Sequence, residues 1–119
     1  MPAWNVEIYH EGIEENSVES YFANLPKNEN AQILQVIKLL QTLGTELQGT
    51  DMDKLIEGPL RELRKGRHRI IYGREGRNFV LLVAFLKRTK KTPKSMIILA
   101  EQRFKAYKAA KKTEKATKR

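Results

Sequence analysis

The pattern of hydrophobic and polar positions predicts four β-strands. Residues 4–9 alternate apolar and polar side chains, which is the period of a strand with one buried face. Residues 79–86 are apolar at every position, so this segment is expected to be a central strand covered on both faces. Two shorter segments, 60–64 and 68–72, precede it and are joined by tight turns. We therefore expect a three-stranded antiparallel meander in the second half of the chain.

Two helices are predicted between the first strand and the meander. Ser17 can cap a short helix whose apolar residues fall at three- and four-residue spacing, and Pro26 ends it. A longer amphipathic helix follows from Asn28. Residues 50–59 carry two aspartates and a Gly-Pro pair, which predicts a loop. The two helices carry little positive charge and are expected to cover one face of the sheet.

A third helix is predicted after Thr92 and Pro93, which suit the N-cap and the first helical position. Its helical character is expected to end near Ala110. Residues 111–119 are basic and polar, and we expect them to form a disordered tail. The order strand, two helices, meander and helix predicts an α+β fold with one sheet, in a single domain over residues 1–110.

Charge is distributed unevenly along the chain. Residues 1–60 contain 3 Lys and Arg against 10 Asp and Glu, a net charge of −7, whereas residues 61–119 contain 20 against 4, a net charge of +16. Five of those 20 cations lie in the tail, so the asymmetry does not depend on it. A strong field of one sign attracts a polyanion, and the C-terminal half is therefore expected to face nucleic acid.

Composition narrows the class of protein further. The chain has 119 residues, of which 40% are hydrophobic, which is enough for one core without metals or disulfides. It contains no cysteine, which excludes disulfides, thiolate metal sites and a cysteine nucleophile. The first residues lack the pattern of a signal peptide, and no apolar run reaches the length of a membrane span. We expect a cytoplasmic protein with no membrane partner.

A cluster of cations follows the predicted central strand. Lys87, Arg88, Lys90 and Lys91 lie between the end of this strand and the expected helix start at residues 92–93. Free backbone N–H groups and the positive end of a helix dipole reinforce nearby cationic side chains. We therefore expect this edge of the sheet to bind an anion.

Arg69 occupies the middle of a predicted strand. Because side chains alternate across a strand, Arg69 shares one face with Ile71, whereas His68 and Tyr72 point to the other face. An unpaired charge would be costly if it were buried there. Either a carboxylate pairs with Arg69, or Arg69 lines a groove.

Three segments carry a resemblance to a known family. They are residues 58–64 (GPLRELR), 69–72 (RIIY) and 85–93 (FLKRTKKTP). Together with the order of the predicted elements, they resemble the RelE superfamily of bacterial toxins, and within it the phage-derived, HigB-like branch. The likeness extends to about Lys108, and it implies a RelE-like fold for nearly the whole chain.

The resemblance implies the toxin of a type II toxin–antitoxin system. Such a protein would be a ribosome-dependent mRNA endonuclease, in which the RNA 2′-hydroxyl attacks the adjacent phosphate without a metal or another cofactor. The partners implied are the ribosome, mRNA in its A site and a cognate helix-turn-helix antitoxin.

The predicted site consists of cations from separate strands and one tyrosine. Forked arginine donors suit phosphate oxygens, a crowded lysine can have its pKa lowered enough to act as acid or base, and tyrosine can stack on a base or donate a proton. The candidate catalytic residues are Arg64, Arg69, Lys87, Lys91 and Tyr72. The candidate RNA-binding residues are Arg61, Arg67, Arg88, Lys90 and Lys94.

The chain departs from relatives in its candidate acid and base residues. Some RelE relatives have lysines in the first strand of the meander, where this sequence has Leu60 and Glu62. Others use histidine and aspartate near the last strand, where this sequence has only cations. Those roles are not carried over, and Glu62 is better explained as the ion-pair partner of an arginine than as a base.

Two other functions remain open on the sequence. One is a nucleic-acid or ribosome binder that occupies a phosphate track without cleaving it. The other is a DNA gyrase inhibitor like the ParE relatives of the same fold. The absence of an evident general base favours the binder, whereas the convergence of arginines from separate strands favours catalysis.

Overall fold

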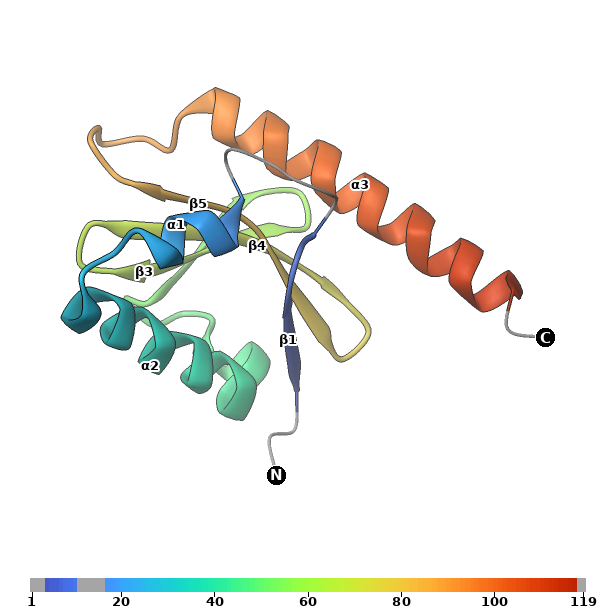
Figure 1. Ribbon diagram of the computed structural model, residues 1–119, viewed down its shortest axis with the longest axis horizontal. Coiled ribbons are helices and arrows are strands. Elements are labelled where there is room, and N and C mark those ends of the chain that lie inside the picture. The colour runs from blue at the N-terminus through green and yellow to red at the C-terminus, as the bar shows by residue number, and fades with distance from the viewer. Residues whose placement is uncertain (1–3, 11–16, 118–119) are drawn as a thin grey trace.

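The computed structural model describes residues 4–10 and 17–117, with side chains as far as Thr113. These residues form a five-stranded sheet that has helices α1 and α2 on one face and helix α3 on the other (Figure 1). The elements in chain order are β1 (Asn5–Ile8), α1 (Val18–Ala23), α2 (Lys27–Leu43), the 3-10 helix η1 (Gly44–Leu47), β2 (Asp53–Glu57), β3 (Leu60–Lys65), β4 (His68–Glu75), β5 (Asn78–Leu86) and α3 (Lys94–Thr117). The α+β class is confirmed, and in the described part of the chain no helix is long and apolar enough to cross a membrane.

The strand order is β1-β5-β4-β3-β2. Strands β2 to β5 pair antiparallel in succession, and β1 pairs parallel with β5 at the far edge. The predicted meander is present as β3, β4 and β5, but the prediction of a loop over residues 50–59 is wrong in its middle, where β2 adds a fourth antiparallel strand. The aspartate that suggested a loop, Asp53, is buried inside the strand because Arg61 and Tyr72 satisfy its carboxylate.

Strand β5 is buried on both faces from Phe79 to Val83, as its sequence predicted, whereas Leu86 at its end is exposed. Phe79 and Leu81 belong to the core cluster beneath α1 and α2, whereas Val80 and Leu82 belong to the cluster beneath α3. The first cluster consists of Val18, Ile33, Val36, Leu40, Leu47, Leu63, Ile70, Tyr72, Phe79 and Leu81. The second consists of Tyr9, Leu60, Ile71, Val80, Leu82, Val83, Ala100, Phe104 and Tyr107.

A bulge interrupts the pairing of β4 with β5 at Leu82. Ile71 pairs with Val83 and Tyr72 pairs with Leu81, so Leu82 is the extra residue on β5. The buried guanidinium of Arg103 on α3 donates to the carbonyl of Leu82 at 2.7 Å. This bond satisfies a carbonyl that the bulge removes from the ladder.

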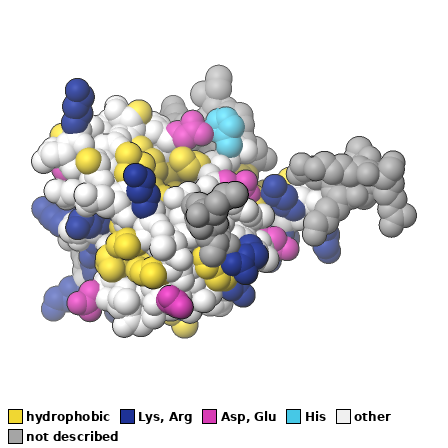
Figure 2. All heavy atoms as spheres, turned by 90° about the horizontal axis from the view of Figure 1, so that it is seen from below, with side chains coloured by type: hydrophobic (Ala, Val, Ile, Leu, Met, Phe, Trp, Pro, Cys, Tyr) yellow, Lys and Arg dark blue, Asp and Glu magenta, His cyan; other side chains and the backbone are white. Residues whose placement is uncertain are grey.

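Helices α1 and α2 begin close to where their sequences predicted, and α1 ends before Pro26 as expected. The Ser17 side chain accepts a hydrogen bond from the backbone N–H of Ser20 at 3.0 Å and so caps α1. Gly44 closes α2 with a φ of 56°, and a Cβ there would lie 2.0 Å from Nε1 of Trp4, so a side chain is excluded. Figure 2 views the molecule from the side on which α2 lies, and shows hydrophobic patches between scattered cations.

Helix α3 differs from its prediction at both ends. It begins at Lys94, and the Pro93 carbonyl accepts the first helical bond, from Ile97, at 3.3 Å. Thr92 is not its cap, because the Thr92 hydroxyl donates to Glu62 instead. The helix continues to Thr117, so the predicted end near Ala110 is wrong.

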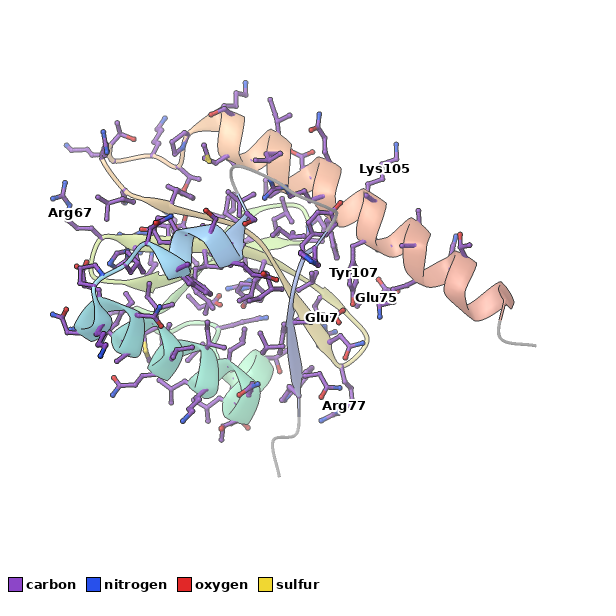
Figure 3. All side chains as sticks on the ribbon, in the orientation of Figure 1. Glu7, Arg67, Glu75, Arg77, Lys105 and Tyr107 are labelled. Carbon is purple, nitrogen blue, oxygen red and sulfur yellow. The ribbon has the colours of Figure 1, made fainter. Side chains whose placement is uncertain are left out.

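Contacts in the C-terminal half of α3 explain its length. The ammonium of Lys111 lies 5.5 Å from the centre of the Tyr107 ring and 3.8 Å from the Glu7 carboxylate on β1. The Tyr107 hydroxyl also donates to Glu7, and Figure 3 shows these two side chains between β1 and α3. Lys111, the first lysine of the predicted tail, therefore packs against Tyr107 and Glu7 at the edge of the sheet.

Candidate active site

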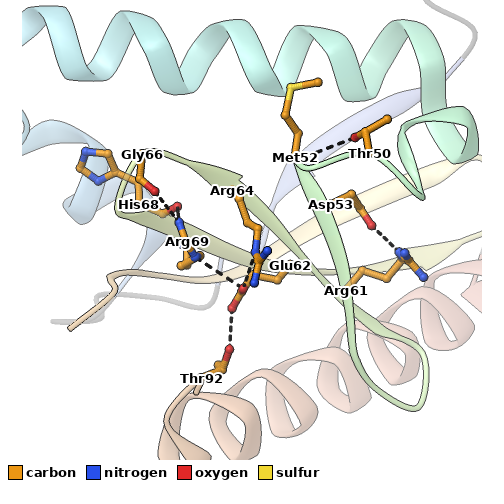
Figure 4. Close-up of polar contacts among 10 residues, drawn as sticks. All are labelled: Thr50, Met52, Asp53, Arg61, Glu62, Arg64, Gly66, His68, Arg69 and Thr92. Atoms are coloured by element: carbon orange, nitrogen blue, oxygen red, sulfur yellow. Dashed lines mark hydrogen bonds and ion pairs between the residues drawn. The ribbon is translucent and has the colours of Figure 1, made fainter. Parts of the chain in front are cut away.

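The Glu62 carboxylate joins three parts of the chain at one end of the sheet (Figure 4). Its Oε1 lies 3.4 Å from Nε of Arg64 on β3 and 3.6 Å from Nε of Arg69 on β4. Its Oε2 accepts a hydrogen bond from the hydroxyl of Thr92, in the segment before α3, at 2.7 Å. Glu62 is only 1% exposed, so this carboxylate is buried among cations.

Strand alternation and register bring these side chains together. On β3, Leu60 faces the α3 cluster, so Glu62 and Arg64, two and four residues on, share its face. Arg64 pairs directly with Arg69 across the β3–β4 ladder. Like charges opposite one another on a sheet repel, and the carboxylate of Glu62 compensates that repulsion.

Arg69 is held on three sides. Its Nη1 donates to the backbone carbonyls of Gly66 at 2.7 Å and His68 at 2.9 Å. Its Nε is buried and has no hydrogen-bond partner among the described residues. Burial lowers the pKa of the Arg69 guanidinium, Glu62 opposes that change and Arg64 adds to it. The sequence left open whether a carboxylate pairs with Arg69 or Arg69 lines a groove, and the ion pair to Glu62 confirms the first of these.

Lys87 is placed by the end of β5. Its backbone N–H donates to the Arg67 carbonyl at 2.7 Å, which extends the β4–β5 pairing by one residue. Desolvation lowers the pKa of the Lys87 ammonium, the charges of Arg69 and Arg64 and, more weakly, Lys54 lower it further, and Glu62 raises it. The charges of Arg64, Arg69 and Glu62 thus act on the ammonium of Lys87.

Five other predicted cations are exposed, in the turns next to β4 and β5 and at the start of α3. Thr89 donates from its hydroxyl to the Lys91 carbonyl at 2.7 Å, which stabilises the turn between β5 and α3. Figure 3 labels Arg67 near the β3–β4 turn, at the opposite end of the sheet from Arg77. The exposed side chains at the cluster's end are Arg67, Arg88, Lys90, Lys91 and Lys94.

Tyr72 does not join the cluster. It is 1% exposed and packs in the core beneath α2, on the opposite face of β4 from Arg69. Its hydroxyl donates to the buried Asp53 carboxylate, and burial, followed by that hydrogen bond, raises the pKa of the phenol. The assignment of Tyr72 to the catalytic residues is thus corrected: a buried, high-pKa phenol on the other face cannot reach the Arg64–Arg69 pair.

Arg61 is also committed to Asp53. Its Nε lies 2.5 Å from Oδ1 of that carboxylate, whose side chain is fully buried, and Arg61 itself is only 20% exposed. An arginine that neutralises a buried carboxylate is not available to RNA without leaving that charge unpaired. The structure therefore assigns Arg61 to the core and not to the exposed cations.

His68 bridges α1 and α2 rather than facing the cations. Its Nδ1 lies 2.6 Å from the Tyr21 hydroxyl, and its Nε2 lies 2.9 Å from the Glu29 carboxylate. These residues line a cavity of about 600 Å³ between α1, β5 and α3. Arg88 also lines it, whereas Arg64, Arg69 and Lys87 do not. This cavity is thus separate from the arginine cluster, and His68 packs as a buried histidine.

The arrangement is suited to anion binding and proton transfer. Two guanidiniums lie opposite one another on the β3–β4 ladder, and their charges act on an ammonium of lowered pKa, which suits binding a phosphate and stabilising added charge on it. Among the described residues there is no group of three or more metal-ligating side chains. Sequence reasoning missed the link from Thr92 to Glu62, because Thr-Pro is equally typical of a helix cap.

Comparison with known proteins gives the family. A family model described as phage-derived protein Gp49-like (DUF891) matches residues 20–105, which include β2 to β5 and the start of α3. A search of curated proteins found no match. The matched segment contains all three cations of the cluster together with Glu62 and Thr92. The chain therefore belongs to the Gp49-like family of phage-derived proteins, a RelE-like toxin family.

Proposed function

We propose that this protein is the toxin of a type II toxin–antitoxin system and that it cleaves mRNA on the ribosome, as in the HigB-like branch. The observation that carries the proposal is the pairing of Arg64 with Arg69 across two strands, beside a lysine of lowered pKa. Membership of a family associated with toxin–antitoxin toxins supports it, and indicates an antitoxin partner. We expect that antitoxin to be a small helix-turn-helix protein.

The proposed reaction is an attack within the RNA, for which this chain supplies cations and an acid. The RNA 2′-hydroxyl loses its proton to solvent as its oxygen attacks the adjacent phosphorus, the bond from phosphorus to the 5′-oxygen breaks, and a 2′,3′-cyclic phosphate and a 5′-hydroxyl remain. Arg64 and Arg69 bind the phosphate oxygens as charge accumulates on them. Lys87, whose pKa is lowered, supplies the proton to the departing 5′-oxygen.

We expect the protein to depend on the ribosome because its site offers few contacts that could recognise an RNA sequence. The predicted RNA-binding residues that stay exposed are cations, which contact phosphate and carry no sequence information. Cleavage requires a single strand with its bases unstacked, and the A site presents mRNA in that form. We expect the ribosome to supply the substrate conformation and this protein to supply the charges.

The test maps RNA ends in translating extracts. Arg69→Ala and Lys87→Ala, singly and together, are compared with Lys105→Ala, a cation that is exposed on α3. Transcript 5′ ends are sequenced with and without prior phosphorylation, which distinguishes 5′-hydroxyl ends. Cuts within codons that carry 5′-hydroxyls and disappear in the cluster variants only are the expected result.

Other outcomes select the other functions. Inhibited translation with intact transcripts, at wild-type protein levels, would contradict cleavage and leave a ribosome binder. DNA breaks with intact transcripts would instead indicate a gyrase inhibitor.

A further inference from the structure

We propose that Glu62 is a positioning residue of this site, whose buried carboxylate fixes the guanidiniums of Arg64 and Arg69 and, through Thr92, the segment that carries Lys87. The inference rests on the proposed cleavage of RNA for its kinetic consequences. The positions that Glu62 imposes on the two guanidiniums concern the protein alone, so they can be tested without RNA.

The two oxygens of Glu62 have separate partners. Oε1 lies between the Nε atoms of Arg64 and Arg69, at 3.4 and 3.6 Å, and Oε2 accepts from the Thr92 hydroxyl at 2.7 Å. One carboxylate thus connects β3, β4 and the segment between β5 and α3. Because it is 1% exposed, solvent does not compete for these contacts.

The contacts to arginine are oriented so that RNA is not excluded. Glu62 meets each guanidinium at Nε and at a distance longer than the 2.7–2.9 Å of a tight charged hydrogen bond. It does not form a two-pronged pair with either arginine. The carboxylate therefore sets the direction of both groups without occupying their Nη atoms. Because Nη1 of Arg69 donates to two backbone carbonyls, Nη2 of Arg69 and the Nη atoms of Arg64 are the donors left for a phosphate.

Glu62 also sets the charge of the site. It is the carboxylate among the charged groups that act on Lys87, the others being Arg69, Arg64 and Lys54. Without it, three cations would repel one another, and the pKa of Lys87 would fall further. A lysine that must hold a proton to donate it would then be active over a narrower range of pH.

Three variants separate these effects. Glu62→Gln keeps the shape and can still accept from Thr92, but it removes the charge. Thr92→Val keeps the charge and removes the tether to the segment. Glu101→Gln, on the exposed surface of α3, is the matched control.

Single-turnover cleavage on ribosomes is then measured against protein concentration and pH. Glu62→Gln is expected to lower the maximal rate by about 10–100-fold, the scale of a misplaced catalytic group, while half-saturation stays constant or falls. Its alkaline decline in rate is expected at lower pH than in the unmodified protein. Thr92→Val is expected to lower the rate without moving that decline, and Glu101→Gln to change neither.

The result that overturns the inference is a folded Glu62→Gln protein with an unchanged rate and an unchanged alkaline decline. A rate loss accompanied by an equal rise in half-saturation would also overturn it, because that indicates lost binding and not lost positioning. If Glu62→Gln does not fold, Thr92→Val decides alone, and a wild-type rate in it contradicts the proposal.

A second readout remains if the protein cleaves no RNA, which would refute the proposed function. The Nε–H resonances of Arg64 and Arg69 are recorded by ¹H–¹⁵N spectroscopy at low temperature. In Glu62→Gln they are expected to lose their separate positions and exchange faster with water. Unchanged resonances would overturn the positioning role whatever the activity.

Discussion

At the scale of single residues, the same residue type serves opposite purposes on the two faces of the sheet. Arg64 and Arg69 face the α3 side and share one buried carboxylate, so they keep a net positive charge. Arg61 is bound by Asp53, which also accepts from Tyr72, so its charge is neutralised within the core. Which arginines are available to a ligand therefore depends on the ratio of carboxylates to cations around each.

Removal of the Tyr72 hydroxyl should affect stability and not activity. In Tyr72→Phe, Asp53 keeps Arg61 but loses a donor, and a buried acceptor left short of a partner costs about 1–3 kcal/mol of unfolding free energy. Urea denaturation measures that loss, and the rate of RNA cleavage per folded molecule should equal that of the unmodified protein. A large fall in rate with unchanged stability would restore Tyr72 to the catalytic residues.

At the scale of elements, the sequence predicted most of the fold because β5 and the helices have strong periodic patterns. It missed β2 because a buried aspartate resembles a turn residue until its partners, eight and nineteen residues away, are known. It ended α3 too early because Lys111, one of the lysines that suggested a tail, lies against the Tyr107 ring and pairs with Glu7 on β1. In both cases a tertiary contact reversed what the local sequence indicated.

The candidate site could be predicted only in part, because its geometry also depends on tertiary contacts. Alternation placed Arg69 and Tyr72 on opposite faces, but it could not tell which face was closed over by α2. The pairing of Arg64 with Arg69 depends on ladder register, and the role of Thr92 depends on a carboxylate thirty residues earlier. Neither the arginine pairing nor the role of Thr92 can be predicted from the spacing of residues along the sequence.

The bulge in β5 should depend on α3. In Arg103→Met the Leu82 carbonyl loses its donor, and we expect a loss of about 1–3 kcal/mol in unfolding free energy. Lys105→Met, two residues along the same helix and exposed, is the control and should change stability little. Equal stability of the two variants in urea would show that the bulge is satisfied in another way.

At the scale of the whole molecule, the exposed cations should contribute more to the affinity for RNA than to the rate of the cleavage step. Each cation that contacts phosphate contributes about −0.7 to the slope of log affinity against log salt for a single strand. Replacing Arg67 and Arg88 with alanine should therefore make that slope shallower by about 1.4. Lys38→Ala, on the outer surface of α2, should leave the slope unchanged. An RNA oligonucleotide titrated at several salt concentrations provides the measurement.

The parallel pairing of β1 with β5 has a consequence for the order of folding. Asn5 pairs with Asn78, so the chain must close a loop of 73 residues before β1 gains a partner, whereas β3, β4 and β5 are joined by short turns. Closing a long loop costs more entropy than closing a short one. We therefore expect Val6→Ala, on β1, chiefly to accelerate unfolding, and Ile70→Val, on β4, to slow folding.

Stopped-flow kinetics in urea would measure both rates, and a folding rate slowed as much by Val6→Ala as by Ile70→Val would contradict this order. On the expected order, the two arginines meet while the N-terminal strand is still unpaired, and that strand is the last to join the sheet and the first to leave it.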